Sequence, residues 1–299
     1  MHAGGLEAAR EAAALLPGNA GLALAYGAAL LEAGLLPEAI AELQRSLRLD
    51  YTSADARHAL GCAWLEAGEP DKALQEFAHL ADVESDIARA MAMKEQTRSD
   101  AGYVRHLFDQ FAADYDRRMI SQLGYAAPSI LRGLADLVIP GRGGIRILDL
   151  GCGTGLSGLA FRDLARRLDG VDLSPVMVEK ARLRGIYDHL AVGDIERVAG
   201  EYDLLIAADT LVYLGDLAPV LGAAARSLQP GGVFLFTVER KEGEGFELGP
   251  KRRWRHSDAY LRQEAAKAGL AVAGLMECAP RHESGQPVAG FAVALSRNE

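Results

Sequence analysis

The chain has 299 residues, of which 49% are hydrophobic and 24% are charged, as in an ordinary globular protein with room for two domains. Its formal net charge is −9, and the acidic excess lies in the first 99 residues, which hold 8 lysines and arginines against 15 acidic residues. An acidic front half argues against a nucleic-acid partner there.

The sequence also gives no sign of a membrane or metal protein. It does not open with a basic segment followed by a short apolar one, and it has no run of about 20 apolar residues. We therefore expect a cytoplasmic protein that does not enter the membrane. Its three cysteines show neither the CxxC spacing nor the cysteine–histidine spacing of metal sites, and they are few and odd in number. We therefore expect no disulfide framework and no metal site.

Residues 1–98 are expected to form a helical repeat domain. Positions 34 residues apart carry equivalent residues: Gly27 and Gly61, Gly34 and Gly68, Ala39 and Ala73, Leu43 and Phe77. The expected helices are residues 5–16, 20–33, 37–49, 54–67 and 70–80, followed by a connecting helix over 82–98.

The 34-residue period resembles that of tetratricopeptide repeats, over about two and a half units. The sequence departs from that pattern at Ala23 and Arg57, where an aromatic residue is usual, and at Tyr51, where proline is usual. The resemblance implies a groove for a protein partner or a surface for self-association. A helical brace packed on the second domain is the alternative.

The second domain, residues 99–299, begins with a helical lid over 100–140. Its segment 108–116 resembles the Phe-Asp-x-Phe-Ala-x-x-Tyr-Asp segment of several small-molecule methyltransferases. The resemblance implies that Tyr103, Phe108, Phe111 and Tyr115 cover a cofactor and help to enclose the substrate. An amphipathic helix that buries Leu107, Phe108 and Phe111 in the core is the alternative. We expect both: the phenylalanines pack, and one or both tyrosines lie at the pocket.

Residues 145–155 predict a buried strand that runs into a glycine turn, with a helix from about residue 156. Gly151, Gly153 and Gly155 permit positive φ angles and let a ligand approach bare backbone, and the helix start favours an anionic ligand group. Part of the turn also fits the dinucleotide pattern GxGxxG. Asp149 argues against that interpretation, because it would repel a pyrophosphate but suits an amino group.

The pattern Asp149-x-Gly151-x-Gly153-x-Gly155 resembles the nucleotide loop of class I S-adenosylmethionine (SAM) methyltransferases. The resemblance implies SAM as the cofactor, S-adenosylhomocysteine (SAH) as its product, and Cys152 among the cofactor contacts. It also implies a Rossmann-like, seven-stranded α/β sheet over residues 145–299, with the last strand antiparallel between its neighbours.

The next two strands end in acidic residues. Asp172 lies at the tip of the strand over 168–173, where its carboxylate can accept hydrogen bonds from both ribose hydroxyls, and helix capping is the alternative. Leu173, the next residue, is also assigned to the cofactor site. Met177 is assigned equally to adenine packing and to the core. Asp194 and Ile195, after a strand over 189–193, resemble the residues that contact adenine in the family.

The fourth strand begins at Tyr202 and leads to the expected point of methyl transfer. Because ligands of such sheets bind beyond the strand ends, Ala208, Asp209 and Tyr213 should face that point. Asp209 as an ordinary loop acid and Tyr213 as a packed ring are the alternatives. The Leu-Gln-Pro-Gly-Gly segment at residues 228–232, followed by an apolar strand, is again typical of the family.

The basic run over residues 251–255 predicts a solvated loop, and an acidic substrate held by Arg253 or Arg255 is the alternative. His256 follows it, and His256 and Tyr213 are the candidate general bases. The sequence thus predicts a SAM-dependent methyltransferase acting on a small-molecule acceptor. A protein methyltransferase recruited through the repeats, and a SAM-binding adaptor without turnover, are the alternatives.

Overall fold

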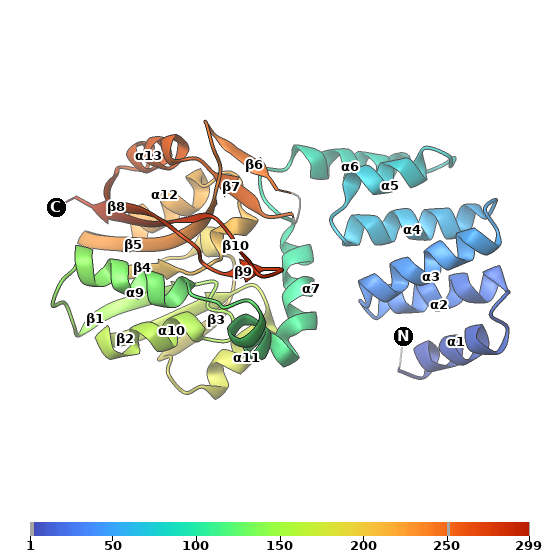
Figure 1. Ribbon diagram of the computed structural model, residues 1–299, viewed down its shortest axis with the longest axis horizontal. Coiled ribbons are helices and arrows are strands. Elements are labelled where there is room, and N and C mark those ends of the chain that lie inside the picture. The colour runs from blue at the N-terminus through green and yellow to red at the C-terminus, as the bar shows by residue number, and fades with distance from the viewer. Residues whose placement is uncertain (1–2, 250–251, 299) are drawn as a thin grey trace. The chain divides into compact units, whose positions relative to one another are not determined.

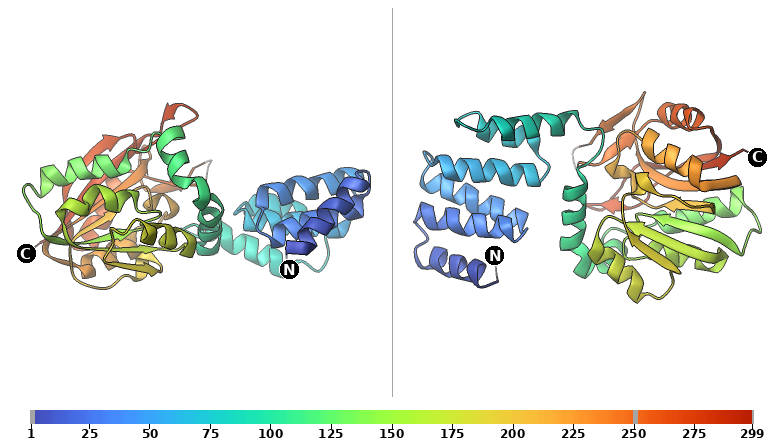
Figure 2. Two further views of the ribbon diagram at one scale, coloured as in Figure 1. Left: turned by 90° about the horizontal axis from the view of Figure 1, so that it is seen from below. Right: turned by 180° about the vertical axis from the view of Figure 1, so that it is seen from behind.

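The computed structural model describes residues 3–249 and 252–298, which divide into two compact units, residues 1–96 and 97–299. The first unit consists of helices that lie side by side in chain order (Figures 1 and 2). They are α1 (Ala3–Leu15), α2 (Ala20–Glu32), α3 (Leu36–Leu49), α4 (Ala54–Glu66), α5 (Pro70–Phe77) and α6 (Glu84–Glu95). No helix in the described ranges combines the length and the apolar character that crossing a bilayer requires.

The contacts inside this unit repeat every 34 residues. A Cβ on Gly27 would lie 2.8 Å from the Leu43 side chain, and one on Gly61 would lie 2.3 Å from Phe77. Glycine at both positions lets consecutive helices approach closely. The caps repeat as well, because Asn19 begins α2 as an N-cap and Ser53, 34 residues later, begins α4. Membership of the tetratricopeptide family stays a prediction.

The second unit is built on a mixed sheet with strand order β3-β2-β1-β4-β5-β11-β8. The first five of these strands are parallel, and β11 is antiparallel to both of its neighbours. The strands are β1 (Ile145–Leu150), β2 (Ala165–Asp172), β3 (His189–Val192), β4 (Tyr202–Ala207), β5 (Leu228–Arg240), β8 (Leu270–Cys278) and β11 (Gly290–Arg297). The predicted Rossmann-like α/β fold is confirmed, and so is the antiparallel last strand.

Helices cover both faces of this sheet (Figure 1). They are α9 (Ala127–Val138), α10 (Leu156–Phe161), α11 (Pro175–Leu183), α12 (Ala218–Ser227) and α13 (Asp258–Lys267). Successive residues of a strand point to opposite faces. Phe234 and Phe236 of β5 therefore join the core beneath α12 and α13, while Leu235 joins the core beneath α9 and α10.

A short helical segment precedes the sheet and begins with α7 (Ala101–Phe111). A 3₁₀ turn (Ala112–Asp114), the single turn α8 (Tyr115–Arg117) and a π turn (Arg118–Gln122) follow it. The lid predicted over 100–140 is shorter in the structure, because α9 packs on the sheet, and we use the name lid for residues 101–122. It is irregular after Phe111, where the sequence predicted only a continuous helical stretch.

The basic run is not the solvated loop that we expected. Trp254–His256 forms β7, which pairs with β5 and with β6 (Phe246–Leu248). Trp254 and Phe246 pack edge to face with ring centroids 5.6 Å apart, so burial of the two rings outweighs the local charge. Lys251, the first residue of the run, lies outside the described residues.

Candidate functional site

A cleft opens where the first four strands end. It holds about 800 Å³ of empty space, part of it open to solvent. The residues predicted for the site that line it are Tyr115, Gly151, Cys152, Gly153, Asp172, Leu173, Asp194, Ile195, Ala208, Asp209 and Tyr213. Strand ends bring these residues together because the carboxyl ends of parallel strands meet at one edge of a sheet.

The glycine turn presents bare backbone to this cleft. Gly151 and Gly153 have φ angles of 70° and 52°. A Cβ on Gly151 would lie 2.3 Å from the Thr210 side chain, whereas nothing lies within 4 Å of a Cβ built on Gly153. Gly151 is therefore required for the close approach to Thr210, and Gly153 leaves space on the cleft side.

Asp172 links the turn to the tip of β2. Its Oδ2 accepts a hydrogen bond from the Gly153 N–H at 2.9 Å, and its Oδ1 accepts one from the Ser174 N–H at 2.8 Å. Burial raises the pKa of this carboxyl, and the two backbone donors oppose the shift. A carboxylate has about four acceptor positions, so the remaining two can still accept ligand hydroxyls. Ser174 caps α11, as the sequence predicted.

Asp194 borders the cleft after β3, and an arginine that the sequence did not single out binds it. Arg98 Nη2 lies 3.1 Å from Asp194 Oδ2, and Arg98 also pairs with Glu196. The same segment is fixed by the Ser99 N–H, which donates to the Tyr213 carbonyl at 2.8 Å. Arg98 and Ser99 line the cleft although they precede the lid in the chain.

Three predicted cofactor residues lie behind the cleft and do not line it. Asp149 is fully buried, and the Tyr187 hydroxyl donates to its Oδ2 at 2.7 Å. Burial raises the pKa of Asp149 to about 7. Gly155 begins α10 with a φ of 94°, next to Tyr187 and Arg184, and Met177 is fully buried in the core. Of the two roles left open for Met177, the geometry favours packing.

Tyr103 also lies outside the cleft and lines a second hollow beside it. Phe108, Tyr115, Asp209 and Tyr213 line both hollows. Phe108 packs edge to face on Tyr115 and Tyr213, with ring centroids 6.0 and 5.5 Å apart. Phe108 therefore lines the cleft, as the resemblance implied, and it also packs on two tyrosines.

The lid is fastened to the glycine turn and to the start of α11 by the two aspartates of its motif. The Ser174 hydroxyl donates to Asp109, and the Thr154 hydroxyl donates to Asp116. Arg184 forms an ion pair with Asp116. The motif was predicted for its aromatic residues, but its acids, seven positions apart, make the polar contacts.

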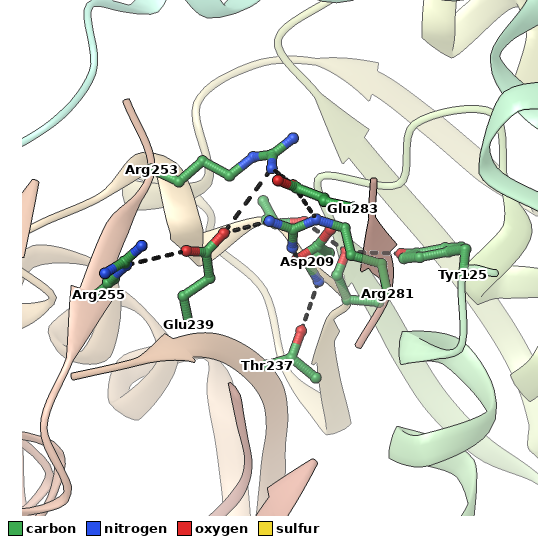
Figure 3. A network of polar contacts seen from close by, with 10 residues as sticks. Tyr125, Asp209, Thr237, Glu239, Arg253, Arg255, Arg281 and Glu283 are labelled. Carbon is green, nitrogen blue, oxygen red and sulfur yellow. Dashed lines mark hydrogen bonds and ion pairs between the residues drawn. The ribbon is translucent and has the colours of Figure 1, made fainter. Parts of the chain in front are cut away.

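Asp209 belongs to a network of ion pairs beside the cleft (Figure 3). Its backbone has a left-handed φ of 58°, and its N–H donates to Thr237 Oγ1 at 2.8 Å. Arg281, 1% exposed, forms ion pairs with Asp209, Glu239 and Glu283. The left-handed conformation costs a non-glycine residue of the order of 1–3 kcal/mol. The contacts of Asp209 in this network therefore stabilise a strained backbone.

Neither candidate base is set up to accept a proton, His256 because of its position and Tyr213 because of its protonation. His256 is fully buried, and its Nε2 lies 3.0 Å from the Gly215 carbonyl oxygen. Burial lowers its pKa to about 4, and it lines neither hollow. Tyr213 does line both, but burial raises the pKa of its phenol, so it is protonated at neutral pH. We retain Tyr213 as a site residue and assign His256 to packing against Tyr260, whose ring stacks on it.

One group of side chains in the described ranges contains residue types that could bind a metal ion, and it lies in the first unit. His58, Cys62 and Asp86 place one possible ligand atom each within 4.8 Å of one another. His58 Nε2 and Asp86 Oδ2 already pair at 3.0 Å, with the imidazole 46% exposed. The cleft described above is formed without these residues.

Residues 148–236 match the family model described as a methyltransferase domain. The chain is 31% identical over 169 residues to a malonyl-[acyl-carrier protein] O-methyltransferase of Serratia marcescens, covering 53% of this chain and 62% of that protein. It is 34% identical over 106 residues to a ubiquinone biosynthesis O-methyltransferase of Xanthomonas oryzae, covering 32% of this chain and 44% of that protein. The chain thus spans less than two thirds of either relative.

A solved structure of Burkholderia thailandensis 1,6-didemethyltoxoflavin-N1-methyltransferase, with SAH bound, has a TM-score of 0.52 at 17% identity. The likeness covers 64% of this chain and 88% of that one, and at this identity it concerns the fold. The family match places a methyltransferase domain at residues 148–236, which include the glycine turn, Asp172, Asp194 and Asp209. Domain and fold together support SAM as the cofactor of the cleft.

Proposed function

We propose that this protein is a SAM-dependent methyltransferase that transfers the methyl group to an oxygen of a small-molecule acceptor. The proposal rests on the position of Asp172. This residue lines the cleft at the tip of β2 and accepts a hydrogen bond from the Gly153 N–H of the glycine turn. Both features lie inside the matched methyltransferase domain. The two relatives named above are O-methyltransferases, which favours oxygen as the acceptor atom.

The residues present fit this cofactor. Backbone without a side chain at Gly153 leaves room for its amino-acid end, and Asp172 offers acceptor positions for ribose hydroxyls. Asp194 and Ile195, beyond β3, would border the base. Tyr115 and Phe108 supply aromatic faces, which attract a cationic sulfonium.

Bound SAM would supply an electrophilic methyl group. The protein's own part is then to hold the acceptor in line with the reacting bond and to keep water out. The lid does both, because Asp109 and Asp116 fasten it across the cleft and its rings lie at the junction of the two hollows. No side chain needs to form a covalent bond for this reaction.

The repeat unit has a separate role in this proposal. We propose that it binds a protein partner or a second copy of the chain, since an array of stacked helices presents an extended surface. Recruitment of a protein acceptor through this unit is the main competitor to a small-molecule acceptor.

Replacing Asp172 tests the cofactor assignment. We expect Asp172→Ala to reduce SAH affinity by at least about 100-fold, because it removes both the ligand contact and the anchor of Gly153. Isothermal titration calorimetry measures the affinity, and circular dichroism checks that the fold is retained. Asp163→Ala is the matched control, since Asp163 is an exposed acid that pairs with Arg132. Unchanged SAH affinity in Asp172→Ala would refute the assignment.

A further inference from the structure

The second hollow meets the cofactor cleft at four side chains. Phe108, Tyr115, Asp209 and Tyr213 line both hollows. A molecule in the second hollow would therefore touch the same residues as the reacting end of a cofactor in the first. This shared border identifies the second hollow as the place from which an acceptor can reach the methyl group.

The wall of the second hollow on the lid side is mostly apolar. Leu107 and Phe111 come from α7, and Met119 and Leu123 come from the π turn and the residue after it. Side chains of this kind bury the body of an apolar molecule, because removing apolar surface from water is favourable. The main part of the acceptor should accordingly be apolar.

Three arginines, Arg118, Arg253 and Arg281, line this hollow. Acids already balance two of them, Arg253 and Arg281 (Figure 3). Arg281 has Asp209, Glu239 and Glu283 as partners. Arg253 forms an ion pair with Glu283 and shares a hydrogen bond with Tyr213. These two cations therefore position the acids and the tyrosine, and they offer little net charge to a ligand.

Arg118 is different. It lines the same hollow, it is exposed, and its guanidinium lies 4.3 Å from the Phe111 ring centroid. It makes no ion pair with an acid anywhere in the described ranges. Asp209 is the one acid among the described residues that line the hollow, and Arg281 neutralises it. The wall thus carries one uncompensated positive charge, at Arg118.

We infer that the second hollow is the acceptor site and that it takes a small, mostly apolar molecule bearing one carboxylate, which Arg118 binds. A hydroxyl at the other end of this molecule lies at the junction formed by Tyr115, Asp209 and Tyr213. The inference rests on the proposed function, because it needs the cofactor in the adjoining cleft. It goes further by naming the chemical class of the acceptor and the residue that selects it.

The reaction balances without another reagent. A lone pair of the acceptor hydroxyl oxygen forms the new bond to the methyl carbon, and the electron pair of the broken carbon–sulfur bond goes to sulfur. The positively charged sulfonium thereby becomes the neutral thioether of SAH. The hydroxyl proton passes to the Asp209 carboxylate, which lies at the junction, and from there to water.

The test compares acids with their neutral amides on the full-length protein saturated with SAH. The probes are 4-hydroxybenzoate and 4-hydroxyphenylacetate, each paired with the corresponding amide, and calorimetry measures their binding. We expect an acid to bind at least about 10-fold more tightly than its amide in the unaltered protein. We expect Arg118→Met to abolish this preference and keep amide binding, because methionine preserves the apolar contact with Phe111.

Arg117→Met is the matched control. Arg117 is the neighbouring exposed arginine, it pairs with Asp114 at 2.9 Å, and it does not line the second hollow. It should leave the preference for the acid unchanged. Raising the salt concentration should weaken acid binding more than amide binding, since Arg118 is exposed to solvent.

Each outcome decides the matter. Equal affinity for acid and amide, no binding of either acid, or an acid preference that survives Arg118→Met would overturn the inference. The proposed function would stand in all three cases, because SAH binding is measured separately in the same samples. Absence of SAH binding would overturn the inference and the proposed function together.

Discussion

The position of Asp149 in the structure differs from the position that the sequence predicts. The sequence assigned it to the cofactor, whereas the structure buries it beneath the glycine turn with Tyr187 as its donor. Its Oδ1 has no hydrogen-bond partner in the described ranges. A carboxyl in such a place favours the proton-bearing form, and its pKa rises from 3.8 to about 7.

This raised pKa predicts a pH-dependent stability. Between pH 4 and pH 7 the folded protein holds a proton on Asp149 that the unfolded chain has released, so stability falls as the pH rises through this window. The loss is about 4 kcal/mol in all, because each tenfold change in proton affinity corresponds to about 1.4 kcal/mol. We expect Asp149→Asn, which has the same shape and no charge, to remove this loss.

Urea unfolding at pH 5, 6, 7 and 7.5 measures the effect. The free energy of unfolding of the unaltered protein should fall relative to Asp149→Asn as the pH rises. Asp136→Asn is the control, because Asp136 is an exposed acid on α9 whose side chain is 64% accessible. Parallel curves for the unaltered protein and Asp149→Asn would show that Asp149 is not buried as described.

At the scale of elements, the lid decides whether the site is closed. Its α-helix gives way to a 3₁₀ turn, a single α turn and a π turn within 12 residues, and polar contacts fix this irregular stretch to the turn after β1. Asp116 accepts a hydrogen bond from the Thr154 hydroxyl and forms an ion pair with the Arg184 guanidinium. A lid held by a few charged contacts can release product without unfolding the sheet beneath it.

The variant Asp116→Asn should therefore loosen the lid without destabilising the protein as a whole. We expect the dissociation rate of SAH to rise about 10-fold, since a hydrogen bond to a charged group contributes about 1.5–3 kcal/mol. Stopped-flow fluorescence measures this rate. The control is Asp114→Asn, because Asp114 is an exposed acid that pairs with Arg117. If Asp116→Asn leaves the rate unchanged, the clamp has no part in retaining the cofactor.

At the scale of the whole molecule, the chain consists of two units that each have their own core. Phe77 and Leu65 are buried inside residues 1–96, and the sheet residues have two further cores in residues 97–299. All the residues that line the cleft and the second hollow belong to the second unit. Cofactor binding should therefore not need the repeats.

Deleting residues 1–96 tests this division of labour. We expect the remaining chain to bind SAH within about twofold of the full-length affinity, as measured by calorimetry, and to keep any activity on a small molecule. Incubation of both proteins with labelled SAM and a cell lysate then separates the alternatives. Label that appears on a protein only with the full-length chain would favour a protein acceptor recruited by the repeats. Loss of SAH binding would contradict two independent units.

Much of the fold could be predicted from the sequence because its signals are local. Alternating strands and helices, the glycine turn and the 34-residue repeat each lie within one short segment, and their positions agree with the structure within a few residues. Predicting the site was harder. Residues at the strand tips, such as Asp172 and Asp194, line the cleft as expected, since the ends of parallel strands must meet at one edge.

The order of the elements, the bare backbone of the turn and the acids at the strand ends can be inferred from the chain alone, because each depends on residues that are neighbours in sequence. Folding in three dimensions is what buries Asp149 and His256 and leaves Arg118 without an acidic partner among the described residues. It also brought Arg281 to Asp209 across 72 residues and Arg98 to Glu196 across 98. Such contacts depend on which faces pack together in the folded chain, and no local pattern encodes them.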